Sequence, residues 1–249
     1  MDARKIELAA HLIPGILALA TYWVAALARK GSGPHRLAGK IYLLAMVALM
    51  VPAVPLSWRV LQRFDVGFGV FLFYLLLITA TAVWQGWTAI VHKRDFSRYA
   101  GAGFRRLAWA NLLAGAGVLG LGLALRQPIF IGFSLPGLLG GRSMLALSRR
   151  GPAHPRWWMG EHLSAMLACG VATHIAFLSI GLPRLLPALA GEGLRTFAWL
   201  APLALALVVR LWLVRKYLPG APLGSLRAPA RDATSAGSAA PTPRGGRGG

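Results

Sequence analysis

The chain has 249 residues, of which 56% are hydrophobic and 14% charged, against about 25% charged residues in an ordinary soluble domain. Its formal net charge of +20 comes without any RNA-binding or zinc-finger motif, so we expect no nucleic-acid binding. Seven acidic residues and one cysteine, Cys169, exclude paired-carboxylate hydrolysis, an intramolecular disulfide and a CxxC metal site.

Seven apolar stretches follow one another, and each has close to the ~20 residues that one membrane crossing needs. The first contains His11 and Pro14 and lacks a cleavage site, so it is read as a span and not as a signal peptide. We predict an all-α integral membrane bundle of about seven transmembrane helices over residues 1–218, with spans near residues 7–28, 39–58, 66–91, 107–125, 127–148, 158–182 and 196–216.

The fifth stretch, 127–148, is the weakest of the seven, because it contains Pro136, a Gly140-Gly141 pair and Arg142. If it is re-entrant, six crossings remain and the later orientation inverts.

After the last span the composition changes. Residues 219–249 are rich in Ala, Pro, Gly, Ser and Arg, cannot form a core, and are predicted to be a disordered basic cytoplasmic tail.

Basic residues alternate between the connections. Of the 27 lysines and arginines, 20 fall in the first, third and fifth connections and at the C-terminal end. The positive-inside rule then places the N-terminus outside and the C-terminus in the cytoplasm. We expect a multi-pass protein of the bacterial cytoplasmic (inner) membrane that meets anionic lipids at its cytoplasmic face. The sequence does not identify a protein partner.

Histidines are the residues with the most chemistry to offer, because an ionisable group at membrane depth is costly. Orientation sorts five of them into an outer pair, His11 with His174, and an inner group of His35, His92 and His162, the last beside Glu161. His154 lies in a loop. Facing imidazoles at two depths are typical of membrane b-type cytochromes, in which they ligate haem iron.

Spacing limits the haem hypothesis. His162 and His174 are 12 residues apart, which puts them about 120° apart around a helix, so one haem is expected at most. The candidate cofactor-binding residues are His11, His174 and His162, with haem b as the cofactor; no other metal site and no catalytic residue is predicted. The same histidines would also serve as hydrogen-bonding contacts between helices or as a proton or substrate site.

One motif carries a resemblance. His35 begins the stretch HRLAGKIY, which has the pattern H-R-x-x-G-[KR]-x-Y at the start of a helix. Together with the early His11 and the late stretch WWMGEHLSAMLACGVATHIAF, it resembles a family of bacterial multi-pass membrane proteins with a domain of unknown function. The resemblance covers roughly residues 8–182 and implies an integral inner-membrane protein with no assigned activity.

Three functions stay open at this point. The leading hypothesis is a membrane haem b protein that transfers electrons. The second is a small transporter or proton-linked permease, and the third is a non-catalytic scaffold subunit in which the histidines only join helices. Whether the protein is an enzyme does not follow from the sequence.

Overall fold

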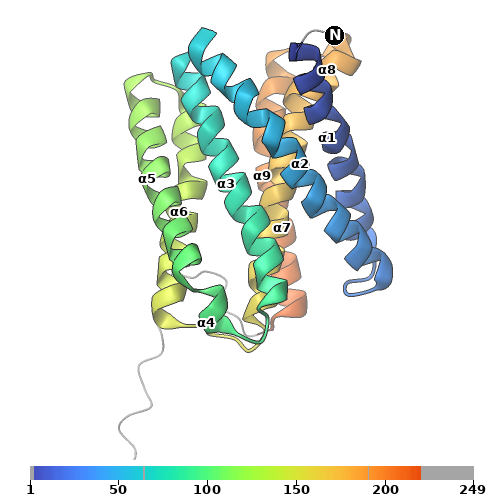
Figure 1. Cartoon of the computed structure of the whole chain (residues 1–249), viewed down its shortest axis with the longest axis vertical. Coiled ribbons are helices and arrows are strands. Elements are labelled where there is room, and N and C mark those ends of the chain that lie inside the picture. The colour runs from blue at the N-terminus through green and yellow to red at the C-terminus, as the bar shows by residue number, and fades with distance from the viewer. Residues whose placement is uncertain (1–2, 64, 190, 220–249) are drawn as a thin grey trace, which may run out of the picture.

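The structure is a computed structural model that describes residues 3–63, 65–189 and 191–219 (Figure 1). It is all-α, without a strand in these ranges, so the predicted fold class is confirmed. Of the predicted tail, 219–249, residues 220–249 lie outside the described residues. The helices are α1 (Ala3–Leu27), α2 (Gly33–Arg63), α3 (Val66–Val91), α4 (Phe96–Tyr99), α5 (Ala102–Ala124), α6 (Pro128–Arg150), α7 (Trp157–Ala176), η1 (Phe177–Gly181), α8 (Leu182–Leu185), η2 (Pro187–Leu189) and α9 (Glu192–Tyr217).

Seven helices in the described ranges are long and apolar enough to cross a membrane, as expected for a multi-pass membrane protein. They are α1, α2, α3, α5, α6, α7 continued through η1 and α8, and α9. The weak fifth stretch is one unbroken helix, α6, which lies beside α5 over the height of the bundle (Figure 1). Helix α2 begins at Gly33, six residues before its expected start at 39.

Local chemistry explains several helix ends. Asp65 caps α3, and its carboxylate accepts the Phe68 N–H at 2.9 Å. Pro128 occupies the first turn of α6, where its missing N–H costs nothing. Helix α6 ends at Gly151, whose φ of +76° is a conformation that favours glycine. These signals place the turns, and membrane-length apolar runs set the helix lengths.

The helices alternate in direction, so the connections gather at two ends (Figure 1). We call one the basic end, which carries the α1–α2 connection at 28–32, the segment 92–101 that includes α4, the α6–α7 connection at 151–156, and Tyr217. The opposite end carries the start of α1, the α2–α3 and α5–α6 turns, and α8. At the opposite end Arg59 pairs with Glu7 at 2.6 Å.

Four helices form a ring that we call the four-helix unit. Helix α1 packs on α2, α2 on α3, α3 on α7, and α7 returns to α1 through a smaller contact. Its interior contains side chains from all four helices, among them Ala18, Tyr42, Met46, Ala82 and Cys169. The α5–α6 hairpin lies against α3, and α9 lies against α7. The four-helix unit therefore joins segments from both halves of the chain.

Close backbone contacts hold the α5–α6 hairpin. A Cβ on Gly141 would meet the Ala108 carbonyl oxygen at 2.5 Å, and one on Gly115 would lie 3.0 Å from the Leu138 nitrogen. Two other glycines of α5, Gly117 and Gly120, have nothing within 4 Å of the same position. Small residues thus allow close helix packing at some glycines of the hairpin and not at others.

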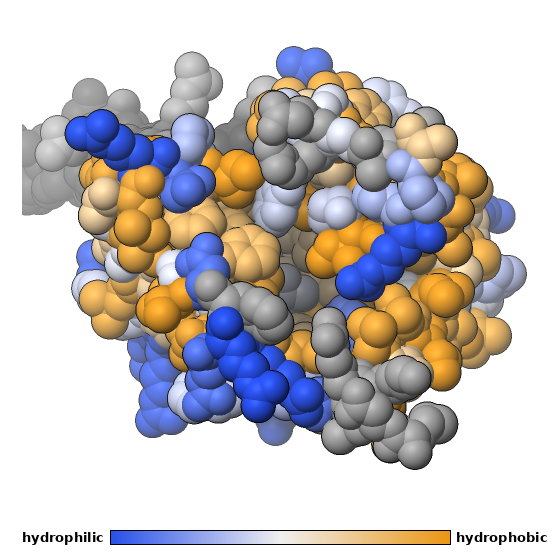
Figure 2. All heavy atoms as spheres, turned by 90° about the horizontal axis from the view of Figure 1, so that it is seen from above, coloured by the Kyte–Doolittle hydropathy of each residue, from blue (hydrophilic) through white to orange (hydrophobic). Residues whose placement is uncertain are grey.

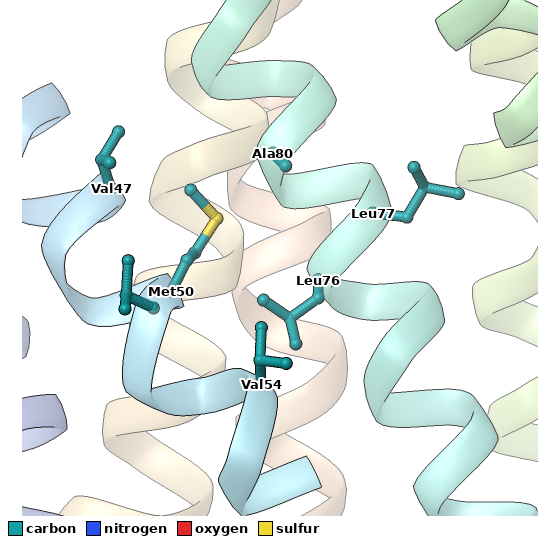
Figure 3. Close-up of a pocket in the computed structure, with 7 residues that line it drawn as sticks. Val47, Met50, Val54, Leu76, Leu77 and Ala80 are labelled. Carbon is teal, nitrogen blue, oxygen red and sulfur yellow. The ribbon is translucent and has the colours of Figure 1, made fainter. Parts of the chain in front are cut away.

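Hydrophobic side chains cover much of the outside, as lipid contact requires. Exposed examples are Ile13 and Ile16 on α1 and Val51 on α2. Seen from the opposite end, hydrophobic residues dominate the flanks and hydrophilic ones are scattered among them (Figure 2). A groove between α2 and α3 has an apolar lining, formed by Val47, Met50, Val51, Val54, Leu76, Leu77 and Ala80 (Figure 3).

Candidate functional site

Four histidines share one hydrogen-bonding pattern. In each, Nδ1 lies 2.7–2.9 Å from a backbone carbonyl oxygen: His11 with Leu49, His35 with Ala25, His162 with Gly86 and His174 with Gly170. A carbonyl oxygen only accepts, so Nδ1 carries the proton and donates it. The lone pair is then on Nε2, which is the arrangement found in metal-ligating histidines.

The structure does not bring His11 and His174 together. His174 lies against Tyr22 and Trp23 of α1, with ring centroids 5.2 and 5.5 Å away. His11 precedes Tyr22 by 11 residues on the same helix, which is roughly 16 Å at 1.5 Å per residue. The two imidazoles therefore have different neighbours, and the structure shows no contact between them that would form the expected outer pair. Whether either one binds a cofactor stays a prediction.

At the basic end, His162 of α7 has neighbours from the α1–α2 connection. His35 and Lys30 lie near enough for their charges to act on His162. Lys30 donates through Nζ to the carbonyls of Ala25 and Ala26 at the end of α1, and His35 is held by the same Ala25 oxygen. His35 and His162, two members of the inner histidine group expected from the sequence, thus lie within electrostatic range of each other.

Glu161 points to a different set of partners from its neighbour His162. Its carboxylate accepts the Tyr99 hydroxyl at 2.9 Å, and the Gln85 side chain also reaches Tyr99. Arg210 of α9 acts on Glu161 electrostatically and donates from Nε to the Ser164 hydroxyl at 3.1 Å. The absence of a direct Glu161–His162 pair agrees with their separation by about 100° around the helix.

Tyr99 is the residue that sequence reasoning missed. It belongs to the short helix α4, which Asp95 caps by accepting the Arg98 N–H and the Ser97 hydroxyl. Only 1% of Tyr99 is exposed. Burial, followed by the adjacent Glu161 carboxylate, raises the pKa of its phenol. Its ring packs on four aromatic rings of the basic end, those of Trp84, Phe96, Phe104 and Trp157.

The other residues with reactive or polar side chains, Cys169, His154, His92 and Asn111, have contacts that explain a structural role. Cys169 is fully buried in the interior of the four-helix unit. His154, in the α6–α7 connection, accepts the Arg156 N–H at Nδ1, which is the reverse of the pattern in the other four histidines. His92 caps the end of α3 through its backbone N–H, which donates to the Thr88 carbonyl. Asn111 of α5 bonds across helices, since its Nδ2 donates to the Thr81 hydroxyl of α3 at 2.8 Å.

No group of three or more His, Cys, Asp or Glu side chains that could hold a metal ion occurs among the described residues. No protein-family model, curated protein or solved structure matches this chain.

Proposed function

We propose that this membrane protein binds haem b at the basic end of the four-helix unit and transfers electrons through it, with His162 and His35 as the axial ligands. The observation that carries the proposal is that these two imidazoles have the same tautomer and the same kind of hydrogen bond. Each donates Nδ1–H to a backbone carbonyl of another helix, Gly86 of α3 or Ala25 of α1, and keeps Nε2 for a ligand.

The surroundings of this pair suit a haem in two further ways. The α1–α2 connection beside it carries Arg29 and Lys30, which line a polar hollow and would pair with the two propionates. Gly39, one turn after His35, has no atom within 4 Å of where a Cβ would stand, which leaves space beside the imidazole. A bound haem b supplies one-electron redox chemistry, and the protein sets its potential through ligands and burial.

His11 and His174 have the same Nδ1 hydrogen bond, but we do not propose them as the two ligands of one haem. Because His11 lies roughly 16 Å along α1 from Tyr22, the neighbour of His174, the two histidines would serve separate groups and not one iron. His162 is therefore the first ligand to test among the three histidines chosen from the sequence, and His35 becomes its partner.

Orientation and location form part of the same proposal. The 20 basic residues assigned to one side support a cytoplasmic basic end, with the N-terminus outside. The cell membrane of a bacterium fits this charge asymmetry. Anionic headgroups would then contact the arginines and lysines of the basic end.

A visible absorption spectrum tests the haem proposal directly. The protein is expressed with added haem precursor, purified in mild detergent, and measured before and after dithionite. We expect a Soret band and sharpened α and β bands on reduction. His162→Ala and His35→Ala should each remove the six-coordinate spectrum, while His154→Ala should leave it unchanged. A featureless spectrum from folded protein would refute the haem proposal.

Proton-linked transport is the second candidate, and the Glu161–Tyr99 hydrogen bond favours it. A carboxylate next to Arg210 and bonded to a buried phenol, at the end of a spanning helix, can take up and release a proton. The test is proton flux into proteoliposomes that enclose a pH-sensitive dye, under an imposed potential. Flux that Glu161→Gln abolishes would support this candidate, and flux equal to that of empty liposomes would reject it.

A further inference from the structure

His174 has a buried atom that lacks a partner. Its Nδ1 donates to the Gly170 carbonyl at 2.7 Å, and its Nε2 has no hydrogen-bonding partner among the described residues. An acceptor buried without a donor costs about 1–3 kcal/mol, and each such atom in a native structure needs an explanation. His174 lies well within the span Trp157–Leu185, where bulk water does not reach it.

Iron is a poor explanation for this particular atom. His11 lies roughly 16 Å along α1 from Tyr22, the residue beside His174, and His162 lies roughly 18 Å from His174 along α7. The rings next to His174 are those of Tyr22 and Trp23, both edge-on. The position offers one acceptor nitrogen between two aromatic side chains, and it lacks a second imidazole at its own depth.

The position is also close to lipid. Trp23, which covers His174 from α1, is 45% exposed on the outside of the bundle. Helix α1 is the least buried of the seven spanning helices, and its contact with α7 is the smallest in the four-helix unit. Three residues after His174, helix α7 widens into the π-helical turn Phe177–Gly181, a form found often at functional sites. The Trp23 indole therefore contacts the His174 ring and also reaches the outside of the bundle.

We infer that His174 Nε2 accepts a hydrogen bond from the hydroxyl of a membrane-soluble hydroquinone, which enters from the lipid between α1 and α7 past Trp23. Such a compound supplies the missing donor, dissolves in the bilayer, and has a flat ring that packs against Tyr22 and Trp23. Tyr22 is itself held in place, since its ring fills the space where a Cβ on Gly170 would lie. The assignment concerns binding alone and does not depend on haem.

The test compares two ligands that differ only in the donor. A decyl-substituted hydroquinone and its dimethyl ether are titrated calorimetrically into the purified protein in phosphatidylcholine nanodiscs, with empty nanodiscs as the reference. One hydrogen bond to an otherwise unpaired nitrogen should make the hydroquinone bind about 10-fold more tightly than the ether. Equal affinity of the two compounds would overturn the inference, and this is also the result expected if a trapped water satisfies Nε2.

Variants locate the effect. His174→Phe keeps an aromatic ring without the acceptor and should erase the preference for the hydroquinone, whereas His154→Phe should retain it. Trp23→Ala should speed association of the hydroquinone with the protein. Trp109→Ala, which removes an exposed tryptophan on α5 instead of α1, should not. A preference that survives His174→Phe would place the binding elsewhere. The readout is heat and not haem absorbance, so this inference and the haem proposal fail or succeed separately.

Discussion

Tyr99 donates its hydroxyl hydrogen to the Glu161 carboxylate across 2.9 Å, and this bond ties the connection between α3 and α5 to the start of α7. The two residues are far apart in sequence, yet the bond lies where aromatic rings close the basic end. Helix α4 has only four residues, so its position depends on this anchor as well as on the Asp95 cap.

Removing the Tyr99 hydroxyl should therefore loosen the basic end. Tyr99→Phe leaves the Glu161 carboxylate without its phenol donor, and we expect a loss of about 1–3 kcal/mol in the free energy of unfolding. Glu161→Gln, which keeps an acceptor oxygen, should cost less. Chemical unfolding in mixed micelles measures both. A double mutant that loses the full sum of the two single effects would show that the residues are not coupled.

Alkaline pH should act through the same phenol. Burial and Glu161 raise the pKa of Tyr99, so its contribution to stability is complete below the unfolded value of about 10 and is lost as pH rises toward the folded value. We expect the unfolding temperature to fall above pH 10, and to fall less steeply in Tyr99→Phe. Identical alkaline slopes in the two proteins would contradict this assignment.

The Gly140-Gly141 pair provides a matched test of helix packing. Gly141→Ala forces a Cβ against the Ala108 carbonyl oxygen at 2.5 Å, which should separate α5 from α6 and cost about 1–3 kcal/mol. Gly140→Ala meets nothing within 4 Å and should be neutral, or more stable by up to about 1 kcal/mol through helix propensity. Thermal unfolding in one detergent compares them, and equal effects would show that the close contact is unimportant.

Tyr74 is inserted into the hydrogen-bond ladder of α6. Its hydroxyl donates to the Phe133 carbonyl at 2.6 Å and accepts the Gly137 N–H at 2.9 Å, one residue after Pro136. Tyr74→Phe should cost about 1–2 kcal/mol because both backbone groups lose this bridge. Tyr217→Phe, at the half-buried end of α9, is the control and should change little. Hydrogen exchange at Gly137 would rise in the first variant only.

Membrane orientation can be tested with single cysteines, because Cys169 is the only native one and is buried. In a Cys169→Ala background, we expect Gln127→Cys, in the exposed α5–α6 turn, to react with a membrane-impermeant maleimide on intact cells. Ala153→Cys, in the α6–α7 connection, should react only after permeabilisation. The reverse pattern would place the basic end outside.

Much of the fold could be predicted from the sequence because hydropathy is local: a run of apolar residues identifies its own helix. Helix α2 exceeded its predicted start because the polar stretch around His35 continues the helix beyond the apolar core. Helical periodicity also predicted correctly that Glu161 and His162, as adjacent residues of one helix, point in different directions. Each of these conclusions uses neighbouring residues on one helix.

The partners of the histidines could not be predicted in the same way, because they depend on which helices become neighbours. His11 and His174 were expected together from their shared depth, but Leu49 of α2 is the partner of one and Tyr22 of α1 flanks the other. Tyr99 gave no signal, because it lies in a segment dense in arginine and lysine that is typical of solvent-exposed loops. A tyrosine among such charges, followed by Gly101, would be the pattern to examine in similar chains.

The ring of the four-helix unit closes through α7, whose first residue, Trp157, follows the end of α3 by more than sixty residues. During synthesis, α1, α2 and α3 enter the bilayer first, and the α5–α6 hairpin follows before α7 leaves the ribosome. The inner histidine group is thus complete only late in synthesis, because His162 belongs to α7. A nascent chain stopped after α6 should insert stably yet fail to acquire any group that needs both His35 and His162, so cofactor loading would be a post-insertion event.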